Sequence, residues 1–189
     1  QCRMILLVDI GNTRVKWATQ VDGRLSPQRA AGYAQWSAVD WQHELFDGPP
    51  VERVLAATVA GGDSRQALET AARKAGTRRV DFVTSTPALA GVRNAYPDPG
   101  LLGVDRWVAV IGAYDRIRGA CVVADIGTAA TIDVVAADGR HRGGFIVPGP
   151  ALMVASLVSG TSDLGARHGS SGPASGTRFA DNTRDAMER

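Results

Sequence analysis

The stretches that decide the fold are ILLVDIGNTRVKW, residues 5–17, and VVADIGTAATIDVV, residues 122–135. Each reads as an apolar strand, the tripeptide Asp-Ile-Gly, a tight turn and a second apolar strand. Glycine lets a backbone turn sharply and approach a ligand closely, and free amides in such turns can cradle an anion. Two hairpins of this form in one chain predict two similar halves that hold a polyphosphate from both sides.

The carboxylates that open the turns, Asp9 and Asp125, indicate the chemistry that we expect there. A carboxylate beside a phosphate requires a cation between them, typically Mg²⁺. A single such turn is also typical of an ordinary hairpin, because Asp, Asn and Gly are common turn residues. The recurrence of the motif after a second buried strand favours the phosphate-binding interpretation.

The remaining segments alternate between strand-like and helix-like patterns. We expect strands at 4–8, 14–19, 23–33, 51–58, 80–83, 120–125, 131–136 and 141–147, and helices at 36–46, 63–75, 105–116 and 149–159. Asp63 or Ser64 is expected to cap the helix at 63–75, and Gly76 to end it. Strands followed by helices, twice over, predict a duplicated α/β architecture with one domain at 1–118 and a second at 119–189.

One face of the helix at 105–116 is expected to carry its large apolar side chains, namely Trp107, Val108, Ile111 and Tyr114. The three histidines are too dispersed for a metal cluster, and we expect His43, His141 and His168 on the surface or in loops.

Composition excludes several kinds of partner. Apolar residues make up 44% of the chain and charged residues 21%, values typical of a soluble globular protein. All but two of the 21 basic residues are arginines and they are scattered, so neither a nucleic-acid surface nor a polybasic membrane anchor is expected. No apolar segment approaches the roughly 20 residues that cross a bilayer. A short apolar run that meets Asp9 at once is no signal peptide, so we expect a cytoplasmic protein.

Three further stretches make the pattern specific. They are YPDPGLLGVDRW at 96–107, GGFIVPG at 143–149 and the Asn-Thr pair at 182–183. With the two hairpins, they resemble the motifs of the type III pantothenate kinases, a family of the acetate-kinase, sugar-kinase, Hsp70 and actin superfamily. The resemblance implies an α/β fold of two RNase H-like domains, each a mixed sheet flanked by helices, with an active-site cleft between them.

The resemblance also implies an enzyme that phosphorylates pantothenate with ATP to give 4′-phosphopantothenate, the first step of coenzyme A biosynthesis. In-line transfer of the γ-phosphoryl group depends mainly on positioning and charge neutralisation. The ATP-binding residues implied are Asp9, Ile10, Gly11, Asn12, Thr13, Arg14, Val15, Lys16 and Thr128. Lys16 is equally well explained as a solvated strand residue, since exposed lysine is the commonest case.

For the acceptor substrate, the resemblance implies Asp105 as the general base that takes the alcohol proton. By position alone, Asp105 is also typical of a helix cap. The other substrate-binding residues implied are Tyr96, Gly103, Val104, Arg106 and Thr183. A guanidinium suits the pantothenate carboxylate, although Arg106 also fits an ordinary surface ion pair, and Tyr96 alone also fits a core residue.

The resemblance implies a monovalent cation, K⁺ or NH₄⁺, at Asp125, and Mg²⁺ held near Asp9 through water or phosphate. It implies a homodimer in which Thr183 completes the substrate pocket of the neighbouring subunit. Members of the family continue well past the Asn-Thr pair, so we expect the C-terminal domain to be truncated. Two alternatives stay open, a non-catalytic transcriptional accessory protein of the same family and another small-molecule kinase of the superfamily.

Overall fold

The computed structural model describes residues 4–161 of the chain. These residues divide into two compact units, the first formed by residues 4–121 and 135–143, and the second by residues 122–134 and 144–161. The domain boundary near Arg118 and Gly119 stays a prediction.

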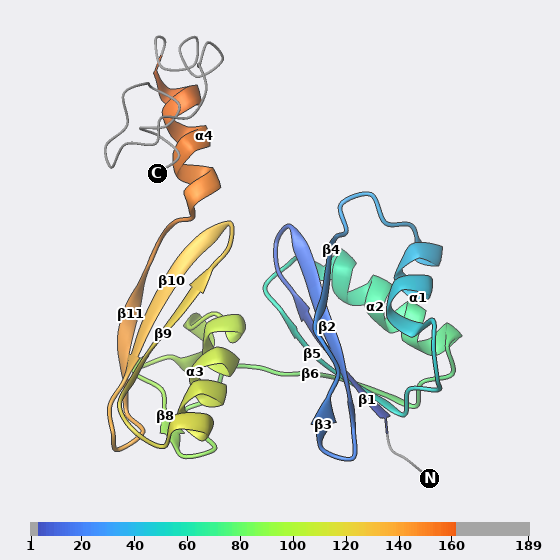
Figure 1. Ribbon diagram of the computed structural model, residues 1–189, viewed down its shortest axis with the longest axis horizontal. Coiled ribbons are helices and arrows are strands. Elements are labelled where there is room, and N and C mark those ends of the chain that lie inside the picture. The colour runs from blue at the N-terminus through green and yellow to red at the C-terminus, as the bar shows by residue number, and fades with distance from the viewer. Residues whose placement is uncertain (1–3, 162–189) are drawn as a thin grey trace, which may run out of the picture. The chain divides into compact units, whose positions relative to one another are not determined.

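A mixed sheet organises the first unit, with β1 at its centre (Figure 1). The strand order is β3-β2-β1-β5-β6, and β4 pairs with β2. Antiparallel pairing joins β2 to β1, β3 and β4, whereas β5 is parallel to both β1 and β6. The strands are β1 (Met4–Ile10), β2 (Arg14–Val21), β3 (Arg24–Leu25), β4 (Arg29–Gly32), β5 (Arg53–Thr58) and β6 (Arg79–Phe82).

Two helices, α1 (Ala38–Phe46) and α2 (Gly62–Lys74), cover one face of this sheet (Figure 1). Their apolar side chains join those of β1, β2 and β5 in a single core, which includes the fully buried Leu6, Val54 and Leu68. The sheet and its helices confirm the expected mixed α/β class.

The two ends of α2 test the caps predicted from the sequence, and one of these predictions is wrong. Helix α2 is capped by Gly61 without a side-chain hydrogen bond, so the expected cap by Asp63 or Ser64 is wrong. The helix starts at Gly62, one residue earlier than expected. The Ser64 hydroxyl donates to the Gly61 carbonyl at 2.8 Å. Gly76, with a φ of +77°, follows the helix end as predicted.

The segment after β6 contains two short strands, β7 (Ala88–Leu89) and β8 (Val92–Arg93), a 3₁₀ turn η1 (Pro99–Leu101) and helix α3 (Val104–Ile117). Helix α3 buries Trp107 and Val110. Val108 is exposed, which contradicts its expected place on the buried face. The position next to Trp107 lies about 100° around an α-helix, whereas a residue three positions on shares its face.

A second sheet has the order β11-β10-β9. It contains β9 (Cys121–Ile126), β10 (Ala129–Val135) and β11 (His141–Pro148), and α4 (Pro150–Gly160) follows it. Only Gly127 and Thr128 separate β9 from β10, and a two-residue connection forces adjacent strands to run antiparallel. The second hairpin is therefore confirmed.

None of the helices within residues 4–161 has the length and apolar character that crossing a membrane requires.

Candidate functional site

The first predicted phosphate loop lies at the carboxyl end of the central strand. Asp9 on β1 is paired in register with Lys16 on β2. Side chains at such opposed positions lie on the same face of a sheet, and the Lys16 ammonium is 3.6 Å from the Asp9 carboxylate. Gly11 closes the turn by donating its N–H to the Arg14 carbonyl at 2.9 Å.

The residues predicted to bind ATP divide into two groups. Ile10 and Val15 are fully buried and pair with each other, so their side chains anchor the loop in the core. Asn12, Thr13 and Arg14 are exposed at the tip. Any contact of the loop with a nucleotide is therefore made by its backbone, by these three residues or by the half-exposed pair of Asp9 and Lys16.

The donor set around Asp9 suits one kind of metal binding. Among residues 4–161, no three His, Cys, Asp or Glu side chains gather into a group that could hold a metal ion. Mg²⁺ keeps several waters and is usually held by one or two carboxylates together with substrate phosphates. Asp9 therefore fits a magnesium ion that arrives with a nucleotide, and does not fit a cage built from protein ligands alone.

The predicted base, Asp105, lies in the first turn of α3 and is not its cap. Gly103 is the N-cap residue, and the Asp105 carboxylate accepts the N–H of Arg106 at 2.7 Å. The helix-cap alternative for Asp105 is therefore wrong. A Cβ atom at position 103 would lie 2.6 Å from Oδ1 of Asp105. Glycine at 103 thus leaves room for the carboxylate, while Val104 is the first residue of the helix.

Tyr96 and Arg106, both predicted to bind substrate, are in contact. Nη1 of Arg106 donates to the Tyr96 hydroxyl at 3.2 Å, and the guanidinium carbon lies 6.0 Å from the centre of the Tyr96 ring. Arg106 is only 6% exposed, so the surface ion pair considered from the sequence is wrong. The more exposed member of the pair is Tyr96, and direct contact between Arg106 and a substrate carboxylate stays a prediction.

His141 also belongs to this cluster, and the sequence prediction missed it. It begins β11 with 1% of its surface exposed, so the expectation of a surface or loop histidine is wrong. Its ring lies parallel to the Tyr96 ring, with an interplanar angle of 2° and 6.4 Å between ring centres. Arg106 and His141 are therefore both neighbours of Tyr96. No local pattern could show this, because the two rings come from segments 45 positions apart.

The second predicted phosphate loop belongs to the second unit. Asp125 and Thr128 are both exposed at the β9–β10 turn. Gly149, the N-cap residue of α4, donates its N–H to the Thr128 carbonyl at 2.9 Å. A Cβ atom at 149 would collide with the Gly127 carbonyl, so only glycine allows this approach. Thr183 lies outside the described residues.

The chain is similar to known proteins in sequence and in fold. Residues 5–189 match the family described as type III pantothenate kinase. The chain belongs to this family. A type III pantothenate kinase of Herminiimonas arsenicoxydans is 42% identical over 97% of the chain, and one of Azoarcus sp. (strain BH72) is 39% identical over 98%. A third, of Aromatoleum aromaticum, is 40% identical over 85% of the chain.

The chain spans 73%, 68% and 65% of the length of these three relatives, respectively. Among solved structures, a Campylobacter jejuni protein described as a Baf family transcriptional activator is 23% identical, with a TM-score of 0.53. That similarity covers 97% of this chain and 71% of the other, and it shows a shared fold.

Proposed function

We propose that the protein transfers the γ-phosphoryl group of ATP to the primary alcohol of pantothenate, giving 4′-phosphopantothenate and ADP. The observation that carries this proposal is the match of residues 5–189 to the type III pantothenate kinases. The local geometry supports it, because the first loop presents Asp9 beside Lys16, and α3 presents Asp105 in its first turn. The reaction would be the first step of coenzyme A biosynthesis.

The first loop binds the phosphates in this proposal. Its turn is fixed by the Gly11 to Arg14 hydrogen bond and anchored by the buried pair of Ile10 and Val15. Lys16 adds positive charge beside the phosphates. Asp9 would hold Mg²⁺ through water or phosphate, and the ion would neutralise charge on the transferring group.

Asp105 acts as the general base for the acceptor alcohol. As the alcohol oxygen bonds to the γ-phosphorus in line with the leaving oxygen, Asp105 takes the hydroxyl proton and ADP departs. Gly103 supports this role, because it leaves the space that the carboxylate occupies. Tyr96 contacts pantothenate, and its own position is supported by its hydrogen bond with Arg106 and its stacking with His141.

The second loop has its own assigned residues in this proposal. We assign Thr128 to a contact with ATP and Asp125 to a monovalent cation, K⁺ or NH₄⁺. Gly149 supports the loop by its hydrogen bond to the Thr128 carbonyl. Family membership further favours a homodimer in which Thr183 of one subunit reaches the substrate pocket of the other.

The test is ADP release with ATP and Mg²⁺, measured with and without pantothenate and with K⁺ or Na⁺, on wild type and Asp105→Asn. We expect turnover that requires pantothenate and K⁺ and collapses in the variant. ATP turnover independent of pantothenate would point to another kinase of the superfamily. No turnover from folded protein would favour the binding-only alternative, and activity retained in Asp105→Asn would remove the base role.

A further inference from the structure

Tyr33 is hydrogen-bonded to the first phosphate loop from outside it. Its hydroxyl donates to the Gly11 carbonyl at 2.7 Å, and the Asn12 carbonyl oxygen lies 3.3 Å away. Tyr33 follows β4, whose last residue, Gly32, pairs with Arg14 at the start of β2. The end of β4 therefore lies beside the loop, and this places the Tyr33 hydroxyl within hydrogen-bonding distance of it.

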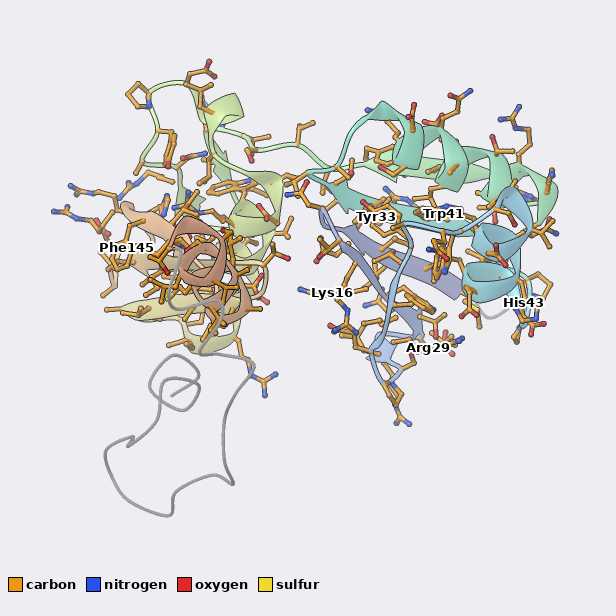
Figure 2. The ribbon with its side chains drawn as sticks, turned by 90° about the horizontal axis from the view of Figure 1, so that it is seen from above. Lys16, Arg29, Tyr33, Trp41, His43 and Phe145 are labelled. Atoms are coloured by element: carbon orange, nitrogen blue, oxygen red, sulfur yellow. The ribbon has the colours of Figure 1, made fainter. Side chains whose placement is uncertain are left out.

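The Tyr33 ring is held by a cluster of tryptophans. It packs edge-to-face on Trp41, with 5.5 Å between ring centres (Figure 2). Trp41 in turn contacts Trp36 at 5.2 Å, and Trp36 contacts Trp17 at 6.2 Å, both edge-to-face. Trp17 and Trp41 belong to the buried core, and edge-to-face contacts are favourable aromatic geometries. The core thus fixes the position from which the hydroxyl reaches the loop.

The Tyr33 hydroxyl remains a hydrogen-bond donor at neutral pH. Burial raises the pKa of Tyr33 above its ordinary value, so the phenol keeps its proton at neutral pH.

The direction of the Gly11 carbonyl determines the direction of the next amide. The peptide bond between Gly11 and Asn12 is trans, and in a planar trans peptide the C=O and N–H groups point in opposite directions. Because the carbonyl points toward Tyr33, the N–H of Asn12 points away from the ring. Backbone amides presented in this way are the groups with which turns bind anions.

We propose that Tyr33 is a positioning residue for ATP binding, which holds the Gly11 carbonyl so that the Asn12 N–H is presented to a phosphate. The inference rests on the proposed kinase function of the same loop. Tyr33 acts through the backbone and does not itself touch the nucleotide.

The test compares Tyr33→Phe with Tyr114→Phe. Both variants keep the ring and lose a phenol hydrogen bond to a backbone carbonyl, since the Tyr114 hydroxyl donates to Ala137 at 3.1 Å, outside the phosphate loop. We expect Tyr33→Phe to raise the KM for ATP roughly threefold to tenfold, the effect of one neutral hydrogen bond. The KM for pantothenate and kcat should stay within about twofold, and Tyr114→Phe should change none of these values.

A second measurement does not depend on turnover. Amide hydrogen exchange of the free protein should be faster over residues 10–16 in Tyr33→Phe than in wild type or Tyr114→Phe. An unchanged KM for ATP in an active Tyr33→Phe enzyme would overturn the proposal, as would equal KM changes in the two variants. If wild type has no kinase activity, the proposed function fails. The exchange result then decides the positioning role alone, and equal exchange in the two variants refutes it.

Discussion

Replacing Asp9 with Asn removes one negative charge from the first loop and leaves the shape of the side chain almost unchanged. The Asp9–Lys16 pair spans 3.6 Å, with side chains 37% and 38% exposed, and exposed ion pairs of this kind contribute about 0–1 kcal/mol to folding. For a chain of this size, that corresponds to a fall in Tm of no more than about 4 °C. Catalysis should suffer far more, because the charge of a bound metal stabilises the transition state by several kcal/mol. A loss of about 3 kcal/mol would lower kcat/KM roughly 100-fold.

The assay is pantothenate-dependent ADP release at several Mg²⁺ concentrations, with Tm measured on the same samples. Asp47→Asn is the matched control, because the Asp47 carboxylate also lies 3.6 Å from a basic side chain, that of His43 on α1. The control should keep wild-type activity. The reasoning is refuted if folded Asp9→Asn retains kcat/KM within about threefold of wild type, or if Asp47→Asn loses as much.

Three further predictions follow from single contacts. Lys16→Met should raise the KM for ATP at least about fivefold, as charge-assisted hydrogen bonds are worth more than neutral ones; an equal effect of Lys74→Met, at the end of α2, would refute a specific role. Gly103→Ala should lower kcat while leaving Tm nearly unchanged, because the added methyl group displaces only the neighbouring carboxylate; an unchanged kcat would argue against that carboxylate as the base. The pKa of Asp81 is lowered, chiefly by a hydrogen bond from Arg79. The ionised Asp81 carboxylate therefore stabilises the fold above the ordinary carboxyl pKa, and this stabilisation is lost as the pH falls. Asp81→Asn should therefore lower Tm at neutral pH, and its Tm difference from wild type should shrink below about pH 4. A Tm difference that stays constant with pH would contradict this explanation.

Much of the fold could be predicted because it depends on short-range patterns. The apolar run that ends at Asp9 predicts β1, and the Asp-Ile-Gly turns predict both hairpins, since strand periodicity and turn chemistry are local. The cap of α2 could not be assigned, because several neighbouring residues can all serve as caps. The observed cap is Gly61, which has no side chain that could have marked it in the sequence.

The contacts around the site depend on tertiary structure. His141 was expected on the surface, yet β11 places it beside Tyr96, and Arg106 is buried against the same ring. Tyr33 has no local signal for its role, because its partner, the Gly11 carbonyl, lies 22 residues earlier. Motifs identify which residue types are present, whereas these supporting contacts exist only once the strands have paired.

The most direct test of the proposed kinase activity is to follow the γ-phosphoryl group of ATP into its product. The protein is incubated with Mg²⁺, K⁺ and ATP labelled at the γ-phosphate, with and without pantothenate, and the products are separated. We predict that the label moves to 4′-phosphopantothenate with wild type and not with Asp105→Asn. Label that stays in ATP, or that appears as inorganic phosphate whether or not pantothenate is present, would contradict the assignment of this chain as a pantothenate kinase.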